Sequence, residues 1–364
     1  MRVGCAASLA FLGIFFAAPA MWAQTANAQS SPPPQSAAEP PACASRADVL
    51  GISRIVEIDT SAGPRFGDQY QDVHFLADGE VVLTFDDGPM RRYTIPILDA
   101  LDAQCTKATF FAVGRMAIAD PDMLKETARR GHTIGSHTWS HQKLKTTTPA
   151  NATREIELGL SAVTKSLGAP VAPFFRFPYL ADTKATLAHL ESRGIGTFGI
   201  DIDSRDFRTR NPGTVFRNVL SQLDQKHRGI ILFHDIQPST AGALASLLAE
   251  LKTRGYKVVH MVPKAQAATV AEYDAIADMA LKAKEVAAKA DPLATRAVTW
   301  PIAPTDQPVV DTSGDGADPA RVDVAQSADT APAARATRRN RKTDWSNVSD
   351  DPWQLKSFGA AGGP

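Results

Sequence analysis

Residues 80–89 read Glu-Val-Val-Leu-Thr-Phe-Asp-Asp-Gly-Pro, a short apolar run that ends in two adjacent acids and a turn. The apolar part, residues 81–85, is predicted to be a buried strand, because such runs bounded by turn residues are typical of parallel sheets. Asp-Asp-Gly-Pro by itself is ordinary turn chemistry. Its meaning therefore depends on the residues at the ends of the other strands of the chain.

Short apolar runs alternate with longer amphipathic segments from residue 81 onward, which predicts repeated β/α units around a parallel sheet. Several of the predicted helices end at a glycine that suits a left-handed cap, namely Gly131, Gly168, Gly194 and Gly255. Seven units in one domain favour a distorted, incomplete (β/α)7–8 barrel, with an open doubly wound α/β sheet as the alternative. The predicted strands are 81–85, 108–113, 133–136, 174–177, 197–200, 230–233 and 257–259, and the predicted helices are 94–103, 121–130, 151–167, 182–193, 212–223 and 242–254.

Composition sets broad limits on the protein. With 364 residues, 44% hydrophobic and 21% charged, the chain can bury one full-sized core and still leave extensions. Lys plus Arg and Asp plus Glu both number 39, so the net charge is zero and offers no overall field to attract nucleic acid or an anionic membrane. We therefore expect no nucleic-acid partner, and we separately expect a monomer.

The N-terminus resembles a secretory signal peptide over residues 1–28. Arg2 precedes an apolar stretch, and Ala26-Asn27-Ala28 forms a small-x-small cleavage pattern. The alternative is an uncleaved anchor, since residues 3–22 are just long enough to span a bilayer. Cleavage would give an exported protein, periplasmic or secreted, without stable membrane insertion.

Export also bears on the three cysteines. Cys5 would leave with the signal peptide, so Cys43 and Cys105 are the only pair available for a disulfide in an oxidising compartment. Two free thiols are the alternative.

The remaining divisions follow composition. Residues 29–48 are rich in Ser, Pro, Gln and Ala and are predicted to be a linker, followed by a globular domain over 49–263. Residues 264–292 are an Ala-rich helix that could pack back on the domain or stand alone. The tail, 293–364, is predicted to be disordered. Its basic cluster at 338–342 is either a binding segment for an anionic or polysaccharide partner or simply solvated.

Polar residues gather where the predicted strands end, which is where β/α barrels assemble their active sites. His137 and His141 are four residues apart, a common zinc-ligand spacing that would put both rings on one face of a helical turn. A chance pair of surface histidines is the alternative, and His132 and His260 are expected to be structural. A carboxylate would complete a two-histidine set that leaves coordination positions open. The five strand-end fragments are 84–89, 137–141, 176–179, 203–207 and 232–235.

These fragments, in this order and with these separations, resemble the five motifs of the NodB-homology polysaccharide deacetylases, carbohydrate esterase family 4. The resemblance covers about residues 80–261. It implies one divalent metal ion, zinc with cobalt or nickel as alternatives, held by Asp87, His137 and His141. It also implies a barrel of the NodB-homology type and an N-acetylated polysaccharide or oligosaccharide as the substrate.

The resemblance further implies a role for each remaining motif residue. Asp86 would be the general base, oriented by Arg176, and His234 the general acid, set against Asp206. The remaining residues would contact the substrate. The backbone amide of Tyr179 would help hold the oxyanion, and Pro178, Phe207 and Leu232 would line the acetyl pocket. Phe207 departs from the family, which usually has Trp there, so the pocket's shape is less well defined by the resemblance than the chemistry.

Each of these catalytic roles has a physical reason. A metal with open positions activates water and polarises a carbonyl, and a nearby carboxylate can take the proton from that water. An arginine can hold the carboxylate through a charge-assisted, even bidentate, contact. A preorganised N–H offsets the charge that grows on the former carbonyl oxygen. Imidazole titrates near neutrality, and a neighbouring acid favours its protonated form, which suits delivery of a proton to the leaving amine.

The expected activity is hydrolysis of a linear amide, with removal of acetyl groups from a chitin-like or peptidoglycan-like glycan. Rival enzymes on the same scaffold are an O-acetyl xylan esterase and a deacylase of small cyclic amides, the latter disfavoured by export. A non-catalytic polysaccharide-binding protein would lack the base, a ligand or the acid, and all are present. A non-haem iron oxygenase also uses two histidines and a carboxylate, but adjacent acids with a separate Arg and His fit hydrolysis better.

Overall fold

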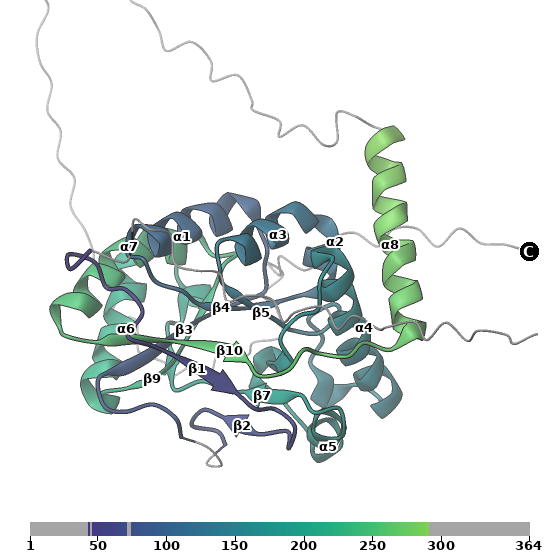
Figure 1. Ribbon diagram of the computed structural model, residues 1–364, viewed down its shortest axis with the longest axis horizontal. Helices are drawn as coiled ribbons and strands as arrows, with labels where there is room; N and C mark the ends of the chain where they lie inside the picture. The colour runs from purple at the N-terminus through teal and green to yellow at the C-terminus, as the bar shows by residue number, and fades with distance from the viewer. Residues whose placement is uncertain (1–42, 44–45, 71–73, 291–364) are drawn as a thin grey trace, which may run out of the picture. The chain divides into compact units, whose positions relative to one another are not determined.

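The computed structural model describes residue 43 and residues 46–70 and 74–290. The predicted signal peptide, most of the predicted linker and the predicted tail lie outside the described residues. Within them, a parallel sheet curls into an incomplete barrel, and helices cover its outside (Figure 1). No helix of the described segments has the length and apolarity needed to cross a membrane.

Strand β3 (Glu80–Asp86) lies at the centre of the sheet, and all of its residues are buried. It pairs in parallel with β9 (Gly229–His234) on one side and with β4 (Thr109–Ala112) on the other. From these neighbours the sheet extends through β5 (Thr133–Ser136), β6 (Phe174–Phe175), β7 (Gly196–Phe198) and β2 (Arg65–Phe66), and in the other direction to β8 (Ile202–Asp203). No ladder joins the end strands β2 and β8 in the described residues, so the barrel is not closed.

Two further strands attach at the start of β3. Strand β10 (Lys257–Pro263) pairs with the first residues of β3, and β1 (Arg54–Ile58) pairs in parallel along β10. This side sheet extends the core beside the amino end of the central strand.

The helices form a layer around the sheet. Each helix contacts the next one in the order α6, α7, α1, α3, α2, α4 and α5. Their bounds are α1 (Arg91–Ala103), α2 (Gly114–Ala119), α3 (Pro121–Arg129), α4 (Pro149–Leu167), α5 (Lys184–Ser192), α6 (Pro212–Lys226) and α7 (Pro238–Thr253).

The period-two alternation of β3 decides which side chains face the helices. Val81, Leu83 and Phe85 belong to the cluster that contains the buried faces of the helices. Val82, on the other face, packs with a separate cluster drawn from other strands. Thr84 and Asp86 share the parity of Val82, so the same alternation carries a hydroxyl and a carboxylate into the barrel.

Helix α8 (Ala271–Ala290) contacts α4 and α2. Ala277 is buried with Leu158 and Ala162 of α4, and Lys165 lies 3.2 Å from Asp278. The Ala-rich helix therefore packs back on the domain, beside α4 (Figure 1).

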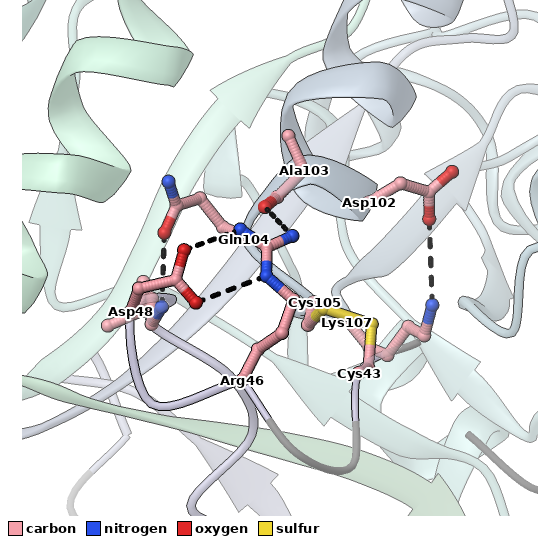
Figure 2. The surroundings of a disulfide bond; sticks show 9 residues. Cys43, Arg46, Asp48, Asp102, Ala103, Gln104, Cys105 and Lys107 are labelled. Carbon is pink, nitrogen blue, oxygen red and sulfur yellow. Dashed lines mark hydrogen bonds and ion pairs between the residues drawn. A yellow bond between two sulfur atoms is a disulfide. The ribbon is translucent and has the colours of Figure 1, made fainter. Parts of the chain in front are cut away.

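Cys43 and Cys105 form a disulfide with 5.7 Å between their Cα atoms. Figure 2 shows the residues around it, including Gln104, whose side chain accepts a hydrogen bond from the backbone of Leu50 at 3.0 Å. Closing a loop of 62 residues should stabilise the fold by about 4 kcal/mol on the chain-entropy model. The bridge ties the segment before β1 to the end of α1.

The seven predicted strands, the six predicted helices between them and the predicted Ala-rich helix are confirmed, and the four expected glycine caps all have positive φ. Helix α7 begins at Pro238, four residues before its predicted start, because proline suits the first turn of a helix. Four elements were missed. Strands β2 and β8 have two residues each, α2 has six, and β1 is largely exposed, so none gives a periodic pattern long enough to recognise.

Candidate active site

Asp86 is the last residue of β3 and is 2% exposed. Its Oδ1 accepts a hydrogen bond from Arg176 Nη1 at 2.7 Å, and the same nitrogen donates to Thr84 Oγ1 at 2.8 Å. Burial raises the pKa of the Asp86 carboxyl above its ordinary value, and the nearby Arg176 charge limits the rise. The result is a buried acid with one oxygen held in place.

Arg176 is fully buried, yet its guanidinium is well satisfied. Nε donates to the carbonyl of Phe198 and Nη2 to that of Gly199, both at 3.1 Å, and Cζ lies 4.4 Å from the centre of the Phe111 ring. These contacts fix the guanidinium plane. Its contact with Asp86 runs through a single nitrogen rather than through a bidentate fork.

Asp87, His137 and His141 converge just above β3. Asp87 Oδ1 lies 3.5 Å from His137 Nε2 and 3.3 Å from His141 Nε2, and the three candidate ligand atoms lie within 4.8 Å of one another. Asp87 Oδ1 is buried and has no hydrogen-bond partner among the described residues. Because an unpaired buried carboxylate oxygen is unfavourable, the residues present fit a cation at this point.

The protonation states of these groups agree with that fit. His137 Nδ1 lies 2.7 Å from the carbonyl oxygen of Arg176; donation there leaves Nε2 as the free lone pair. Burial lowers the pKa of His137 to about 3, so its ring is neutral near neutral pH, as metal ligation requires. Burial also raises the pKa of Asp87 to about 7, a rise that a neighbouring cation would oppose.

The segment carrying His141 is not a helical turn, so that part of the sequence-based interpretation was wrong. Thr138 and His141 have φ values of 68° and 60°, in the left-handed region. Glu155 of α4 accepts hydrogen bonds from the backbone and hydroxyl of Ser140, both at 2.8 Å. A Cβ on Gly159 of α4 would lie 2.4 Å from the carbonyl carbon of Thr138. Helix α4 therefore sets the course of the ligand loop.

His234 ends β9 and pairs in register with Asp86. Its Nδ1 lies 2.7 Å from Asp206 Oδ1, and its backbone N–H donates to Asp206 Oδ2 at 2.7 Å. Thr240 also donates to Asp206. Burial would lower the pKa of His234, but the Asp206 carboxylate outweighs burial and raises that pKa to about 10. The imidazole is thus held protonated, with Nε2 lying 4.0 Å from Asp87 Oδ2.

Two exposed aromatic rings flank the buried groups. Tyr179 is 62% exposed and its ring centre lies 4.9 Å from that of His141, while Phe207 is 50% exposed and lies 5.7 Å from His234. Pro178 and Leu232 are buried. Pro178 directly precedes Tyr179 in the chain, and Leu232 lies two residues before His234. The buried polar centre is therefore bordered by apolar surface open to solvent.

The structure brings the buried candidates from all five strand-end fragments into one region, through the contacts given above. Sequence reasoning missed the residues that support them. Thr84 could have been found, since it lies two residues before Asp86 on the same strand face. Glu155 and Thr240 carry no motif and lie 15 and 34 residues from their partners Ser140 and Asp206, so only the folded chain identifies them.

Known proteins share this fold and these sequence features. The family described as polysaccharide deacetylase matches residues 76–198. A peptidoglycan-N-acetylglucosamine deacetylase of Listeria monocytogenes is 34% identical over 182 residues, which is 49% of this chain and 37% of that protein. A chitin deacetylase of Colletotrichum lindemuthianum is 30% identical over 193 residues, covering 50% of this chain and 77% of that one.

A solved structure agrees in fold. The peptidoglycan deacetylase of Bdellovibrio bacteriovorus superimposes with a TM-score of 0.55 at 38% identity, over 60% of this chain and 61% of that one. The matched region thus spans little more than a third of the Listeria relative and about three fifths of the Bdellovibrio chain. With most of the Colletotrichum protein matched at 30% identity, however, the chain belongs to the polysaccharide deacetylase family.

Proposed function

We propose that this protein is a metal-dependent hydrolase that removes acetyl groups from a poly- or oligosaccharide containing N-acetylglucosamine. The observation that carries the proposal is the clustering of Asp87, His137 and His141 beside a second buried acid, Asp86, which Arg176 holds separately. The names of the relatives, peptidoglycan and chitin deacetylases, support the choice of substrate class.

In this proposal Asp87, His137 and His141 hold one divalent ion, zinc, with cobalt or nickel as alternatives. Two nitrogens and one carboxylate oxygen suit zinc and leave coordination positions for water and substrate. Such an ion, when bound, polarises a carbonyl group and lowers the pKa of water.

Asp86 is proposed as the general base. Arg176 holds its Oδ1, which leaves Oδ2 to accept a proton from the attacking water. Oδ2 lies 3.8 Å from His137 Nε2, so the base faces the ligand cluster. An acid whose pKa is raised by burial is a stronger base than one in water, which favours this proton transfer.

His234 is proposed as the general acid. Asp206 accepts a hydrogen bond from Nδ1–H and its charge keeps the ring protonated, so Nε2–H can deliver a proton to the leaving amine. The backbone amide of Tyr179 is proposed to stabilise the oxyanion. Pro178, Phe207 and Leu232 are proposed to line the acetyl pocket.

The wider organisation is also proposed. We infer export after cleavage of residues 1–28 and a periplasmic or secreted location, which the disulfide supports because such bonds persist in oxidising compartments. The catalytic domain is placed at 49–263, the Ala-rich helical segment at 264–292, the tail at 293–364, and the protein is taken as a monomer without nucleic-acid partners.

Acetate release by the purified protein tests the function. We expect release from chitin oligomers or peptidoglycan, its loss with a chelator, and its return when zinc is added. Acetylated xylan serves as the comparison, and release from xylan alone would favour an O-acetyl esterase on the same scaffold. Binding of these glycans without any release would favour a non-catalytic polysaccharide-binding protein.

A further inference from the structure

The loops at the carboxyl end of the sheet carry basic side chains that the mechanism does not use. Lys143 and Lys145 follow His141, and Arg208 and Arg210 follow Asp206 and Phe207. All four are exposed, and none has an ion-pair partner among the residues that the structure describes. We call these four residues the basic rim.

The basic rim is a local feature rather than a property of the whole chain. The chain has equal numbers of acidic and basic residues. At the amino end of the sheet, Arg254 lies 2.6 Å from Asp224 and Arg228 3.3 Å from Asp78, although exposed Lys257 has no ion-pair partner among the described residues. The four residues of the basic rim therefore add unpaired positive charge to loops that also carry the candidate catalytic residues.

The rim approaches the site through two loops. One follows β5 and the other follows β8, and these strands lie four places apart in the order β8-β9-β3-β4-β5. On a curled sheet, loops so far apart in strand order border different parts of its mouth. A glycan lying across the site would therefore meet positive charge at two places.

Arg208 provides the link to the chemistry. Its guanidinium carbon lies 5.3 Å from the centre of the Phe207 ring, and that ring lies 5.7 Å from the His234 imidazole. A single aromatic ring therefore separates a solvent-facing guanidinium from the proposed general acid. Guanidinium groups bind carboxylates with two parallel hydrogen bonds, and stacking on an aromatic ring restricts their orientation.

We propose that the site selects a glycan carrying carboxylate groups over a neutral one, and that Arg208 and Arg210, with Lys143 and Lys145, bind those carboxylates. The inference rests on the proposed deacetylase function and narrows its substrate. The carboxylates belong either to an acidic substituent of the sugar or to a peptide attached to the glycan. Both sources present the same group to the rim.

The test compares three substrates of matched length: a neutral N-acetylchitotetraose, a peptide-free peptidoglycan tetrasaccharide and its peptide-bearing form. The metal-loaded protein should show a kcat/KM about tenfold higher on an acidic substrate than on the neutral one. Rising salt should reduce that ratio, because exposed charges are screened. If the peptide-free tetrasaccharide is already preferred over the neutral one, the recognised carboxylate belongs to the sugar. If only the peptide-bearing form is preferred, the recognised carboxylate belongs to the peptide.

The double variant Arg208→Gln/Arg210→Gln should lose most of this preference, since each exposed charge pair contributes up to about 1 kcal/mol, or roughly threefold to fivefold. Turnover of the neutral tetramer and metal content should stay within about twofold. Arg228→Gln, at the amino end of the sheet, is the matched control and should change neither substrate. Equal loss on neutral and acidic substrates, or no preference in the unaltered protein, would overturn the proposal.

Affinity measurements distinguish a failure of this proposal from a failure of the proposed deacetylase function. If no substrate releases acetate, the deacetylase assignment fails, and the affinity of Asp86→Asn protein for the three glycans then decides the question of charge. Tighter, salt-sensitive binding of the acidic glycans would support the basic rim, whereas equal affinities would refute it.

Discussion

The two ends of the central sheet obey different rules. At the amino end, left-handed backbone falls largely on glycines such as Gly79, Gly131 and Gly255, and the exposed Arg228 and Arg254 are ion-paired. At the carboxyl end, left-handed backbone falls on residues with side chains, including Asp87 and His141. Each such residue costs of order 1 kcal/mol or more and persists only where packing determines it.

This contrast separates the part of the fold that supplies stability from the part that carries unfavourable features. The fully buried β3 and the helices packed on it supply the stabilisation, while the unfavourable features gather where β3 ends. These features are Asp87 Oδ1 without a hydrogen-bond partner, the left-handed backbone of Asp87 and His141, and the buried charge of Arg176. Substitutions at the carboxyl end should therefore change activity, and those at the amino end should change stability.

The largest expected effect is at the candidate metal site. Asp87→Ala and His141→Ala should each lose the metal and lower acetate release by more than about a thousandfold, because each removes a ligand. Asp86→Asn should keep the metal and lose activity by about 10²–10⁴-fold, the usual range for a general base. Metal content by elemental analysis, alongside acetate release, checks both. Normal turnover by Asp86→Asn would remove the assignment of the base.

A smaller effect is expected at the partner of the proposed acid. Asp206→Asn removes the charge that raises the pKa of His234, so the imidazole should lose its proton at lower pH. The alkaline limb of the pH–rate profile should move to lower pH, and activity near pH 8 should fall about tenfold to a hundredfold. An unchanged alkaline limb would contradict the role of His234. Metal content should match that of the unaltered protein.

At the amino end, loss of the disulfide should change stability alone. Cys43→Ser/Cys105→Ser should lower the free energy of unfolding by up to about 4 kcal/mol. Acetate release at 25 °C should remain within about twofold, because Cys105 lies at the end of α1, away from the ligand cluster. Chemical denaturation with and without a reductant measures the effect. A matching loss of activity in the folded variant would weaken the contrast between the two ends.

Two buried histidines predict a weaker, pH-dependent effect. Burial lowers the pKa of His260 to about 4 and that of His132 well below its ordinary value. The unfolded chain therefore binds protons below about pH 6.5 that the folded chain does not, so stability falls as pH decreases from about 6.5 toward 4. His260 alone should account for up to about 3 kcal/mol.

Denaturation curves between pH 4 and pH 8 measure this dependence. His260→Gln can keep the hydrogen bond to Thr133 without a titrating group, so it should flatten part of the curve. A slope unchanged by that substitution would show that other groups dominate.

Much of this architecture is visible in the sequence because its signals are local. The apolar run of β3, the glycines after the helices and the polar residues after each strand can be read within a few positions of one another. The spacing of His137 and His141 pointed to a ligand pair, although not to the backbone that brings them together. That backbone depends on Glu155 and Gly159, which belong to a different element.

The sequence by itself determined the parallel β/α order, the strand ends that carry polar residues and the family resemblance, since periodicity and turn chemistry act between near neighbours. Only the tertiary structure decided that the barrel stays open between β2 and β8, that Cys43 is bridged to Cys105, and that α8 packs on α4. It also decided the left-handed path of the His141 loop. These features depend on groups far apart in the chain, whose contacts form only when the buried core brings them together.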